Sequence, residues 1–115
     1  MVDENAILLV LSNSVSADRE AEFNEWYNNV HCDEVTNLPG FTNVARYRVI
    51  AQVNPPDGEP AYRYLALFEL NDPQLALQSL AKSASEFKMS TAIDLAGSQV
   101  VAFEKIFPVQ AKKEA

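Results

Sequence analysis

The sequence predicts an α+β domain in which strand, helix, strand, strand, helix and strand follow one another. Short runs rich in Val, Ile, Leu and aromatic residues alternate with stretches whose apolar residues recur at helical spacing. A chain of 115 residues is long enough for one hydrophobic core and too short for two independent ones. We therefore expect a single domain over residues 1–115, with its core at about residues 5–107 and a tail over residues 108–115.

The first part of the chain is expected to form one strand and one helix. Residues 5–12 are a short apolar run, which predicts a buried strand. Ser16 is placed to cap a helix, and apolar side chains then recur at the i, i+3, i+4 and i+7 positions up to a predicted end near Val30. These side chains belong to Phe23, Trp26, Tyr27 and Val30. Gly40, after Pro39, tolerates a positive φ and closes the link to the next strand.

The middle of the chain is expected to form two long strands joined by a loop. Residues 41–53 and 62–70 are rich in Val, Ile, Thr, Tyr and Phe, which favour strands. Residues 54–60 contain three prolines and a glycine, so they predict the connecting loop. In the second of these strands, Tyr62, Tyr64, Ala66 and Phe68 should share one face, with Arg63, Leu65, Leu67 and Glu69 on the other.

The last part is expected to form a second helix and a final strand. Asp72 followed by Pro73 predicts a helix start, and the helix should end near Phe87. Its predicted apolar stripe consists of Leu77, Leu80, Ala81 and Ala84. Residues 88–97 show no clear period and predict either a loop or a short extra helix, and residues 99–107 predict the last strand.

This order defines the ferredoxin-like βαββαβ arrangement with a four-stranded antiparallel sheet. Two helices cover only one face of such a sheet, yet the predicted strands carry apolar or aromatic residues on both faces. An uncovered apolar face of that size favours association. We therefore expect a two-fold homodimer in which the two sheets pack face to face.

Charge and composition restrict the classes of partner and cofactor. The formal net charge of −7 disfavours nucleic acid and anionic membrane surfaces. The longest apolar run, residues 6–11, is too short for a membrane span, no basic segment precedes it, and the single cysteine fits a reducing compartment, so we expect a cytoplasmic protein. Three scattered glycines form no phosphate loop, and one His with one Cys is too few for an ordinary metal site, although a carboxylate site stays open.

The stretch over residues 22–41 is best suited to chemistry. It contains the only Trp, His and Cys of the chain, followed by two carboxylates: Trp26, His31, Cys32, Asp33 and Glu34. On a helical wheel His31 lies on the side of Phe23 and Tyr27, at the edge of the apolar stripe, so it can face inward. An imidazole there can move a proton from a phenol, enol or acidic carbon, and a neighbouring carboxylate could fix its tautomer and raise its basicity.

The same stretch resembles the signature of the dimeric α/β-barrel superfamily, and within it most closely the EthD-like proteins. The likeness rests on Trp26-Tyr27, on His31 four positions later, on Leu38-Pro39-Gly40-Phe41, on Arg46-Tyr47-Arg48 and on residues 64–70. It covers about residues 6–107. Relatives usually carry proline two positions after the histidine, where this sequence has Asp33. The resemblance implies a ferredoxin-like chain that dimerises into an α/β barrel.

The superfamily includes cofactor-free cyclases, isomerases and lyases, in which a histidine and a tyrosine are the usual catalytic pair. The resemblance therefore implies His31 as general acid or base and a tyrosine, Tyr27 or Tyr47 in the matched segments, that stabilises an oxyanion. Candidate substrate-binding residues are Phe23, Trp26, Tyr64, Phe68 and Phe103, with Asp33 and Glu34 as possible supports of the histidine. This predicts a cofactor-independent lyase, cyclase or isomerase that acts on a hydrophobic, aromatic or polyketide-like molecule.

Other interpretations of the same residues stay open. The superfamily also includes haem proteins and monooxygenases, in which His31 would be an axial ligand, and a dimer could bind a small molecule without turnover. His31 could equally cap carbonyls near a helix end, with Trp26 and Tyr27 as core aromatics and Cys32 as a structural residue. Arg46 and Arg48 would then be surface or interface residues.

Overall fold

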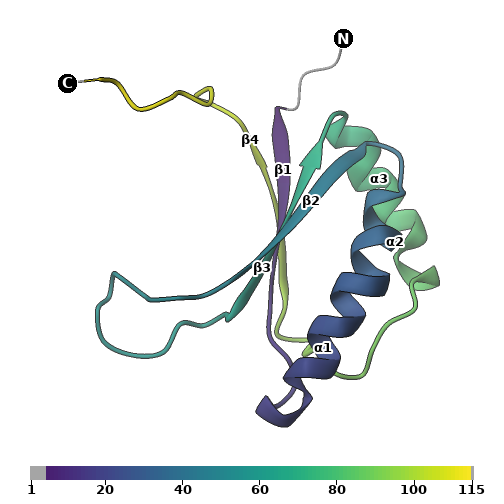
Figure 1. The fold of residues 1–115 in the computed structure, drawn as a ribbon. Helices are drawn as coiled ribbons and strands as arrows, with labels where there is room; N and C mark the ends of the chain where they lie inside the picture. The colour runs from purple at the N-terminus through teal and green to yellow at the C-terminus, as the bar shows by residue number, and fades with distance from the viewer. Residues whose placement is uncertain (1–4, 115) are drawn as a thin grey trace.

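The computed structural model describes residues 5–114 and contains one four-stranded sheet with helices on one side (Figure 1). Its elements in order are β1 (Ala6–Ser12), the 3-10 turn η1 (Ala17–Arg19), α1 (Glu20–Trp26), the π-helical turn η2 (Tyr27–His31), α2 (Cys32–Thr36), β2 (Phe41–Arg48), β3 (Tyr64–Leu70), α3 (Pro73–Ser83), the 3-10 turn η3 (Ala84–Glu86) and β4 (Gln99–Glu104). All pairings are antiparallel, in the order β2-β3-β1-β4. The predicted α+β, ferredoxin-like fold is confirmed.

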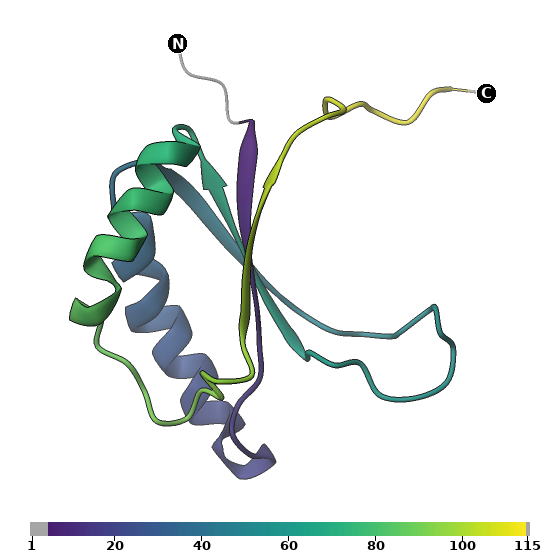
Figure 2. The ribbon, with the colours of Figure 1, turned by 180° about the vertical axis from the view of Figure 1, so that it is seen from behind.

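The core lies between the sheet and the helices, which cover the same face in both views (Figures 1 and 2). In β3 the residues alternate between buried and partly exposed, because successive strand side chains point to opposite faces. The buried set of β3 is Tyr64, Ala66, Phe68 and Leu70, as the sequence pattern predicts. The helices contribute Phe23, Tyr27, Val35 and Ala76 to the same core. The opposite face of the sheet has no helix over it.

The first helix is longer than predicted. Helical backbone continues past Val30 to Thr36, because a π-turn is inserted in which the Cys32 N–H donates to the Tyr27 carbonyl. Asp33 lies in this extension, where proline would remove a main-chain donor and obstruct the preceding turn. Ser16 makes no side-chain capping bond and precedes the 3-10 turn rather than α1.

Three strands are shorter than predicted. β2 ends at Arg48, β3 begins only at Tyr64 and β4 ends at Glu104. Residues 49–63 form a long loop that extends beyond the sheet, and Ile50 within it is fully exposed. The residues after Arg48 favour strand geometry in isolation, but beyond Val49, which donates to the Arg63 carbonyl, they lack a neighbouring strand to extend the ladder.

Helix α3 begins as predicted but presents a different face. The Asp72 side chain accepts a hydrogen bond from the Leu75 N–H at 3.1 Å, and Pro73 occupies the first turn. Leu80 packs against the core, whereas Leu77 and Ala81 are exposed and Ala76 is fully buried. The first turn of α3 packs closely against the Gly40 turn, where a Cβ added at Gly40 would lie 2.5 Å from the Ala76 nitrogen.

The structure also decides the conformation of the segment between α3 and β4. Residues 88–98 form a loop and an isolated bridge rather than a helix, and this loop carries the buried residues Ala92 and Ile93. Within residues 5–114, none of the helices combines the length and apolarity needed to cross a membrane.

Replacement of Gly40 should strongly destabilise the fold. Gly40 has φ +94°, and a Cβ there would lie 2.5 Å from the Ala76 nitrogen and 2.7 Å from the Asp72 carbonyl oxygen. A left-handed conformation costs about 1–2 kcal/mol for other residues, and forced overpacking adds about 1–3 kcal/mol. We expect Gly40→Ala to lower the free energy of unfolding in urea by about 3 kcal/mol.

Gly58→Ala is the matched control for this change. Gly58 has φ +101°, but no atom lies within 4 Å of the position that a Cβ would occupy. The control therefore carries the cost of the left-handed backbone without the clash. Equal losses of stability in both variants would contradict the steric explanation.

Candidate functional site

A cavity of about 270 Å³ lies between the helices and the sheet. Apolar side chains from β1, β3, β4, α3 and the loop after α3 form most of its wall. The polar side chains in this wall are Tyr27, His31 and Ser98, and the Ser98 hydroxyl donates to the Asp94 carbonyl at 2.8 Å. The groups free to recognise a ligand therefore come from Tyr27 and His31, both in η2.

The π-turn determines how these side chains meet. It places Trp26 and His31, five residues apart, in a stack with ring centroids 4.7 Å apart and an interplanar angle of 19°. Tyr27 and His31 meet edge to face at 5.0 Å, and Phe87 contacts His31 from the other side at 5.4 Å. The imidazole is thus held by three aromatic rings, which fixes its orientation at the cavity wall.

Glu34 orients the imidazole. Its Oε1 lies 3.2 Å from His31 Nδ1, and its Oε2 accepts a hydrogen bond from the Lys88 N–H at 2.6 Å. The carboxylate is therefore held at both oxygens, and it favours the tautomer in which Nδ1 carries the proton and Nε2 is left as an acceptor. Of the two carboxylates predicted near the histidine, the structure brings Glu34 to it, while Asp33 is exposed on α2.

His31 is held in its neutral form. Burial lowers its pKa, and the hydrogen bond and charge of Glu34 raise it by less, with the Arg46 charge adding to the decrease. The expected effect of a neighbouring carboxylate is present, since Glu34 raises the pKa of His31, but burial outweighs it because the side chain is only 12% exposed. A neutral imidazole with a bare Nε2 is the form that can accept a proton.

The Tyr27 hydroxyl has no hydrogen-bond partner within residues 5–114. Tyr27 is 1% exposed, and its hydroxyl oxygen is buried. Burial raises the pKa of Tyr27 well above its ordinary value, and the Arg46 charge opposes this only in part. The phenol therefore stays protonated and can donate a hydrogen bond to a bound molecule. An unsatisfied buried hydroxyl is costly, so its retention is a reason to look for a ligand.

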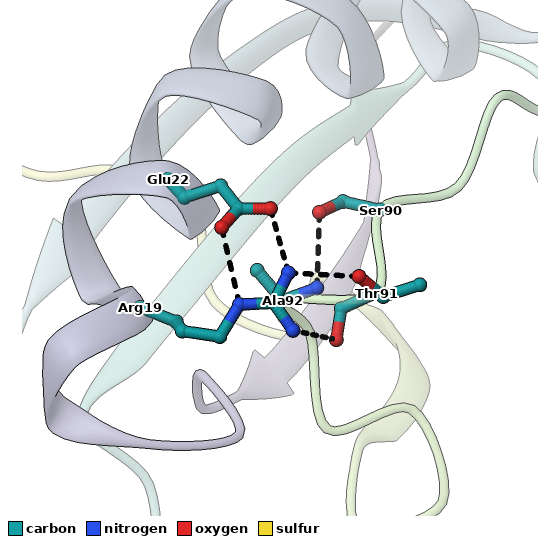
Figure 3. A network of polar contacts seen from close by, with 5 residues as sticks. All are labelled: Arg19, Glu22, Ser90, Thr91 and Ala92. Atoms are coloured by element: carbon teal, nitrogen blue, oxygen red, sulfur yellow. Dashed lines mark hydrogen bonds and ion pairs between the residues drawn. The ribbon is translucent and has the colours of Figure 1, made fainter.

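Polar contacts hold the loop after α3 against the first helix (Figure 3). Arg19 donates to both Glu22 carboxylate oxygens, at 3.1 and 2.7 Å, and to the Thr91 hydroxyl and carbonyl, at 2.7 and 3.3 Å. Further along, Trp26 Nε1 donates to the Lys88 carbonyl at 2.7 Å. These contacts fix the loop whose apolar side chains close one side of the cavity.

Arg46 is a residue near the site that the sequence interpretation left on the surface. It lies on β2 on the helix side of the sheet, half-buried, with its guanidinium carbon 4.2 Å from the Tyr27 ring centroid. Arg46 pairs with Ala66 in the β2–β3 ladder and therefore lies on the side of the sheet that faces Tyr27. The alternation of residues in the sequence does not show which side of β2 this is. Cys32, by contrast, is buried in the core, and burial raises the pKa of its thiol.

The structure separates the remaining predicted site residues. Phe68 lines the cavity together with Tyr27 and His31. Phe23 and Tyr64 are buried beside Tyr27, where the Tyr64 hydroxyl donates to the Glu20 carboxylate and accepts from the Asn24 amide. Tyr47 and Phe103 lie on the uncovered face, 54% and 49% exposed. The structure thus brings Tyr27, and not Tyr47, to His31. Among residues 5–114, no three His, Cys, Asp or Glu residues gather as a metal site would require.

The topology is that of the ferredoxin-like fold, with a four-stranded antiparallel sheet in the order β2-β3-β1-β4. The chain belongs to the family described as a domain of unknown function (DUF4286), whose model matches residues 6–110. No curated protein matches the sequence.

Three solved structures share the fold. HapK from Hahella chejuensis has a TM-score of 0.63 at 14% identity, covering 94% of this chain and 99% of that chain. An ethyl tert-butyl ether D (EthD) family protein from Bacillus halodurans C-125 has a TM-score of 0.62 at 19% identity, covering 88% and 99%. The haem degrader MhuD from Mycobacterium tuberculosis, with two haems in its active site, has a TM-score of 0.63 at 17% identity, covering 91% and 99%. The expected resemblance to the dimeric α/β-barrel superfamily is confirmed at the level of the fold.

The titration of His31 should show the effects of both burial and Glu34 on its pKa. We expect an NMR titration of His31 to give a pKa below the ordinary value of about 6.5, because burial outweighs Glu34. The unfolded chain then binds more protons, so the free energy of unfolding should decrease as pH falls from about 6.5 through the folded pKa.

Variants of the two neighbouring carboxylates provide the control for this titration. Glu34→Gln should lower the His31 pKa further, because it removes a negative charge and its hydrogen bond. Asp33→Asn, one residue away and exposed, should leave it nearly unchanged. A His31 pKa above about 6.5 would contradict the conclusion that burial affects this pKa more than Glu34 does.

Proposed function

We propose that this protein binds a small hydrophobic molecule in the cavity between helix and sheet and acts on it by cofactor-independent acid/base catalysis, as a lyase, cyclase or isomerase. One observation carries the proposal. A neutral histidine held by Glu34 and a phenol that has no hydrogen-bond partner among residues 5–114 come from one π-turn and line one largely apolar cavity. Their rings meet at 5.0 Å, so both can act on one bound molecule.

The two groups supply complementary parts of a proton transfer. His31 Nε2 takes a proton from a carbon next to a carbonyl group, and the electron pair of that C–H bond moves onto the carbonyl oxygen. The Tyr27 hydroxyl donates a hydrogen bond to the oxygen that gains this charge. His31 then returns the proton to another carbon, which completes an isomerisation. In a cyclase the enolate carbon instead adds to a second carbonyl carbon, whose oxygen takes the electron pair and then the proton. In a lyase the enolate expels a leaving group from the neighbouring carbon, and that group takes the electron pair and then the proton. No external oxidant or reductant is required.

The dimensions and lining of the cavity support a compact ligand. About 270 Å³ lies just below the range of roughly 300–1,000 Å³ common for ligand pockets. The wall offers apolar side chains and two aromatic rings, Phe68 and Phe87, and the described lining residues include no cation or carboxylate. An aromatic or polyketide-like molecule with a carbonyl or phenolic oxygen fits these features.

A haem-binding or monooxygenase role is the alternative for the same site. MhuD, which shares the fold, degrades haem, and His31 with Nδ1 directed to Glu34 has the hydrogen bonding that an axial histidine usually shows. The haem macrocycle does not fit a cavity of about 270 Å³. A haem absorption band that forms on reconstitution and is lost in His31→Ala would overturn the cofactor-free proposal. Ligand binding without turnover is the other alternative.

Removal of the Tyr27 hydroxyl should separate binding from stability. Because this hydroxyl has no hydrogen-bond partner among the described residues, Tyr27→Phe should leave the free energy of unfolding unchanged or raise it by about 1 kcal/mol. The same change should weaken binding of an aryl ketone about tenfold, since a hydrogen bond to the ligand is lost. Trp26, the only tryptophan, stacks on His31 and reports binding through its fluorescence.

Further variants test separately the role of the Tyr27 hydroxyl in binding and the role of His31 as the base. Tyr64→Phe removes a hydroxyl that is bonded to Glu20 and Asn24, so it should lower stability and leave the ketone affinity unchanged. His31→Gln should abolish exchange of the α-protons of bound aryl 1,3-diketones in heavy water, followed by NMR. Unchanged exchange in His31→Gln would rule out its role as the base.

We also propose that two copies pack through the uncovered face of the sheet. Apolar side chains from all four strands lie there: Ile7, Leu9, Leu11, Tyr47, Leu65, Leu67, Val101 and Phe103. The 49–63 loop and the C-terminal segment extend on this side in both views, with Ile50, Ile106 and Val109 almost fully exposed (Figures 1 and 2). A second copy of the chain would cover both the apolar face of the sheet and these exposed segments. We further propose that residues 1–115 form a single domain and that the protein is cytoplasmic.

Disruption of the uncovered face should give monomers. Leu67 lies opposite Leu9 in the β1–β3 ladder, so Leu67→Lys places a charge at the centre of the proposed interface. We expect the wild type to sediment as a dimer and Leu67→Lys as a monomer. Leu77→Lys, an equal change at an exposed site on α3, should stay dimeric. A wild type that is monomeric at micromolar concentration would disprove this interface.

A further inference from the structure

Arg46 is a half-buried cation that lacks an anionic partner. Its guanidinium donates to the Asn28 Oδ1 at 2.7 Å and to the Asn24 Oδ1 at 3.0 Å, both neutral amides. Its Nε is buried with no hydrogen bond, and within residues 5–114 no ion pair to it is found. The Glu20 carboxylate, which could have paired with a cation here, accepts the Tyr64 hydroxyl instead. Burying an unpaired charge is costly, which makes a purely structural role a poor explanation.

The contacts of Arg46 lead to the proposed site through Tyr27. The guanidinium carbon lies 4.2 Å from the Tyr27 ring centroid, against 5.5 Å from those of Phe23 and Tyr64. Tyr27 also lines the cavity, whereas no residue of β2 does. Tyr27 therefore lies between a positive charge on one side and the ligand cavity on the other.

We propose that Arg46 is a positioning residue that acts through Tyr27, making the cavity selective for a ligand whose oxygen is an anion or becomes one, namely a phenolate or an enolate. This inference rests on the proposed function and narrows its substrate class. A cation over the ring face draws electron density from the phenol, so the Tyr27 hydroxyl becomes a stronger donor to negative oxygen. The two asparagine contacts keep the guanidinium in that position.

The electrostatics of the neighbouring groups agree with this role. The titratable groups that affect Tyr27 are Arg46 at its face and Cys32 behind it, with His31 at its edge. Burial raises the pKa of the Cys32 thiol, so it stays neutral, and His31 is neutral as well. Arg46 therefore supplies the positive charge in this group, in a chain whose net charge is −7. Without it, an anionic oxygen beside Tyr27 would have no positive charge from these groups to balance it.

The test uses para-nitrophenol, whose phenolate absorbs visible light, with the full chain. The pKa of the bound probe is measured by absorbance, and its affinity by Trp26 fluorescence. We expect the wild type to lower the pKa of the bound probe relative to the free probe. Arg46→Gln should reduce the preference for phenolate over phenol about tenfold, which is one unit of the probe's pKa. Arg46→Lys keeps the charge and should retain most of the preference.

Controls distinguish this role from a structural one. Arg48→Gln removes the same charge from the exposed end of β2 and should leave the bound probe unchanged. Arg46→Met keeps the apolar stem and replaces Arg46→Gln if the latter does not fold. If the probe binds and its pKa is the same in the wild type and in the neutral Arg46 variant, the inference is overturned while the proposed cavity function stands. If the wild type does not bind para-nitrophenol, the proposed function itself fails, and the inference with it.

Discussion

The main-chain hydrogen bond from the Cys32 N–H to the Tyr27 carbonyl is the contact on which the site depends. It replaces an α-helical turn with a π-turn, so residues five apart come into line, and Trp26 stacks on His31. The same turn directs Tyr27 and His31 to one cavity and lets the helix continue to Glu34, which then reaches the imidazole one turn further on. A regular helix would turn Trp26 away from His31, whereas Tyr27 and His31, four residues apart, would still share one face. The wide turn lies where Tyr27 and His31 line a largely apolar cavity, and π-turns inside helices are frequent at functional sites.

Desolvation sets the chemical state of each group in the site. Burial lowers the pKa of His31 and raises those of Tyr27 and Cys32, so all three are neutral at neutral pH. Glu34 is stabilised by its contacts with His31 and the Lys88 N–H, which lets a carboxylate lie near the cavity without entering it. Arg46 remains charged at the other side of Tyr27. A neutral base, a phenol and a cation behind the phenol are arranged in sequence, and this suits a reaction in which negative charge develops on a bound oxygen.

The two faces of the sheet serve different purposes. The helix-covered face holds the core and the cavity, and the loop after α3 closes the cavity through contacts such as Arg19 to Thr91. The other face exposes apolar side chains that one copy of the chain cannot cover. Tyr47 and Phe103 belong to this second face, so a role for them would be in association, while Tyr27 and Phe68 belong to the first.

The sequence by itself determined the element order, the buried face of β3, the Asp72 cap and the concentration of rare residues around His31, because periodicity and capping are local properties. It also drew attention to Tyr27 and Tyr47 equally, since both lie in the matched segments. Only the tertiary structure decided between them, because the face on which Tyr47 lies depends on pairing with β3. It likewise decided the helix end at Thr36, the choice of Glu34 over Asp33, and the buried place of Arg46. These depend on a main-chain bond and on packing between distant segments, and neither leaves a period in the sequence.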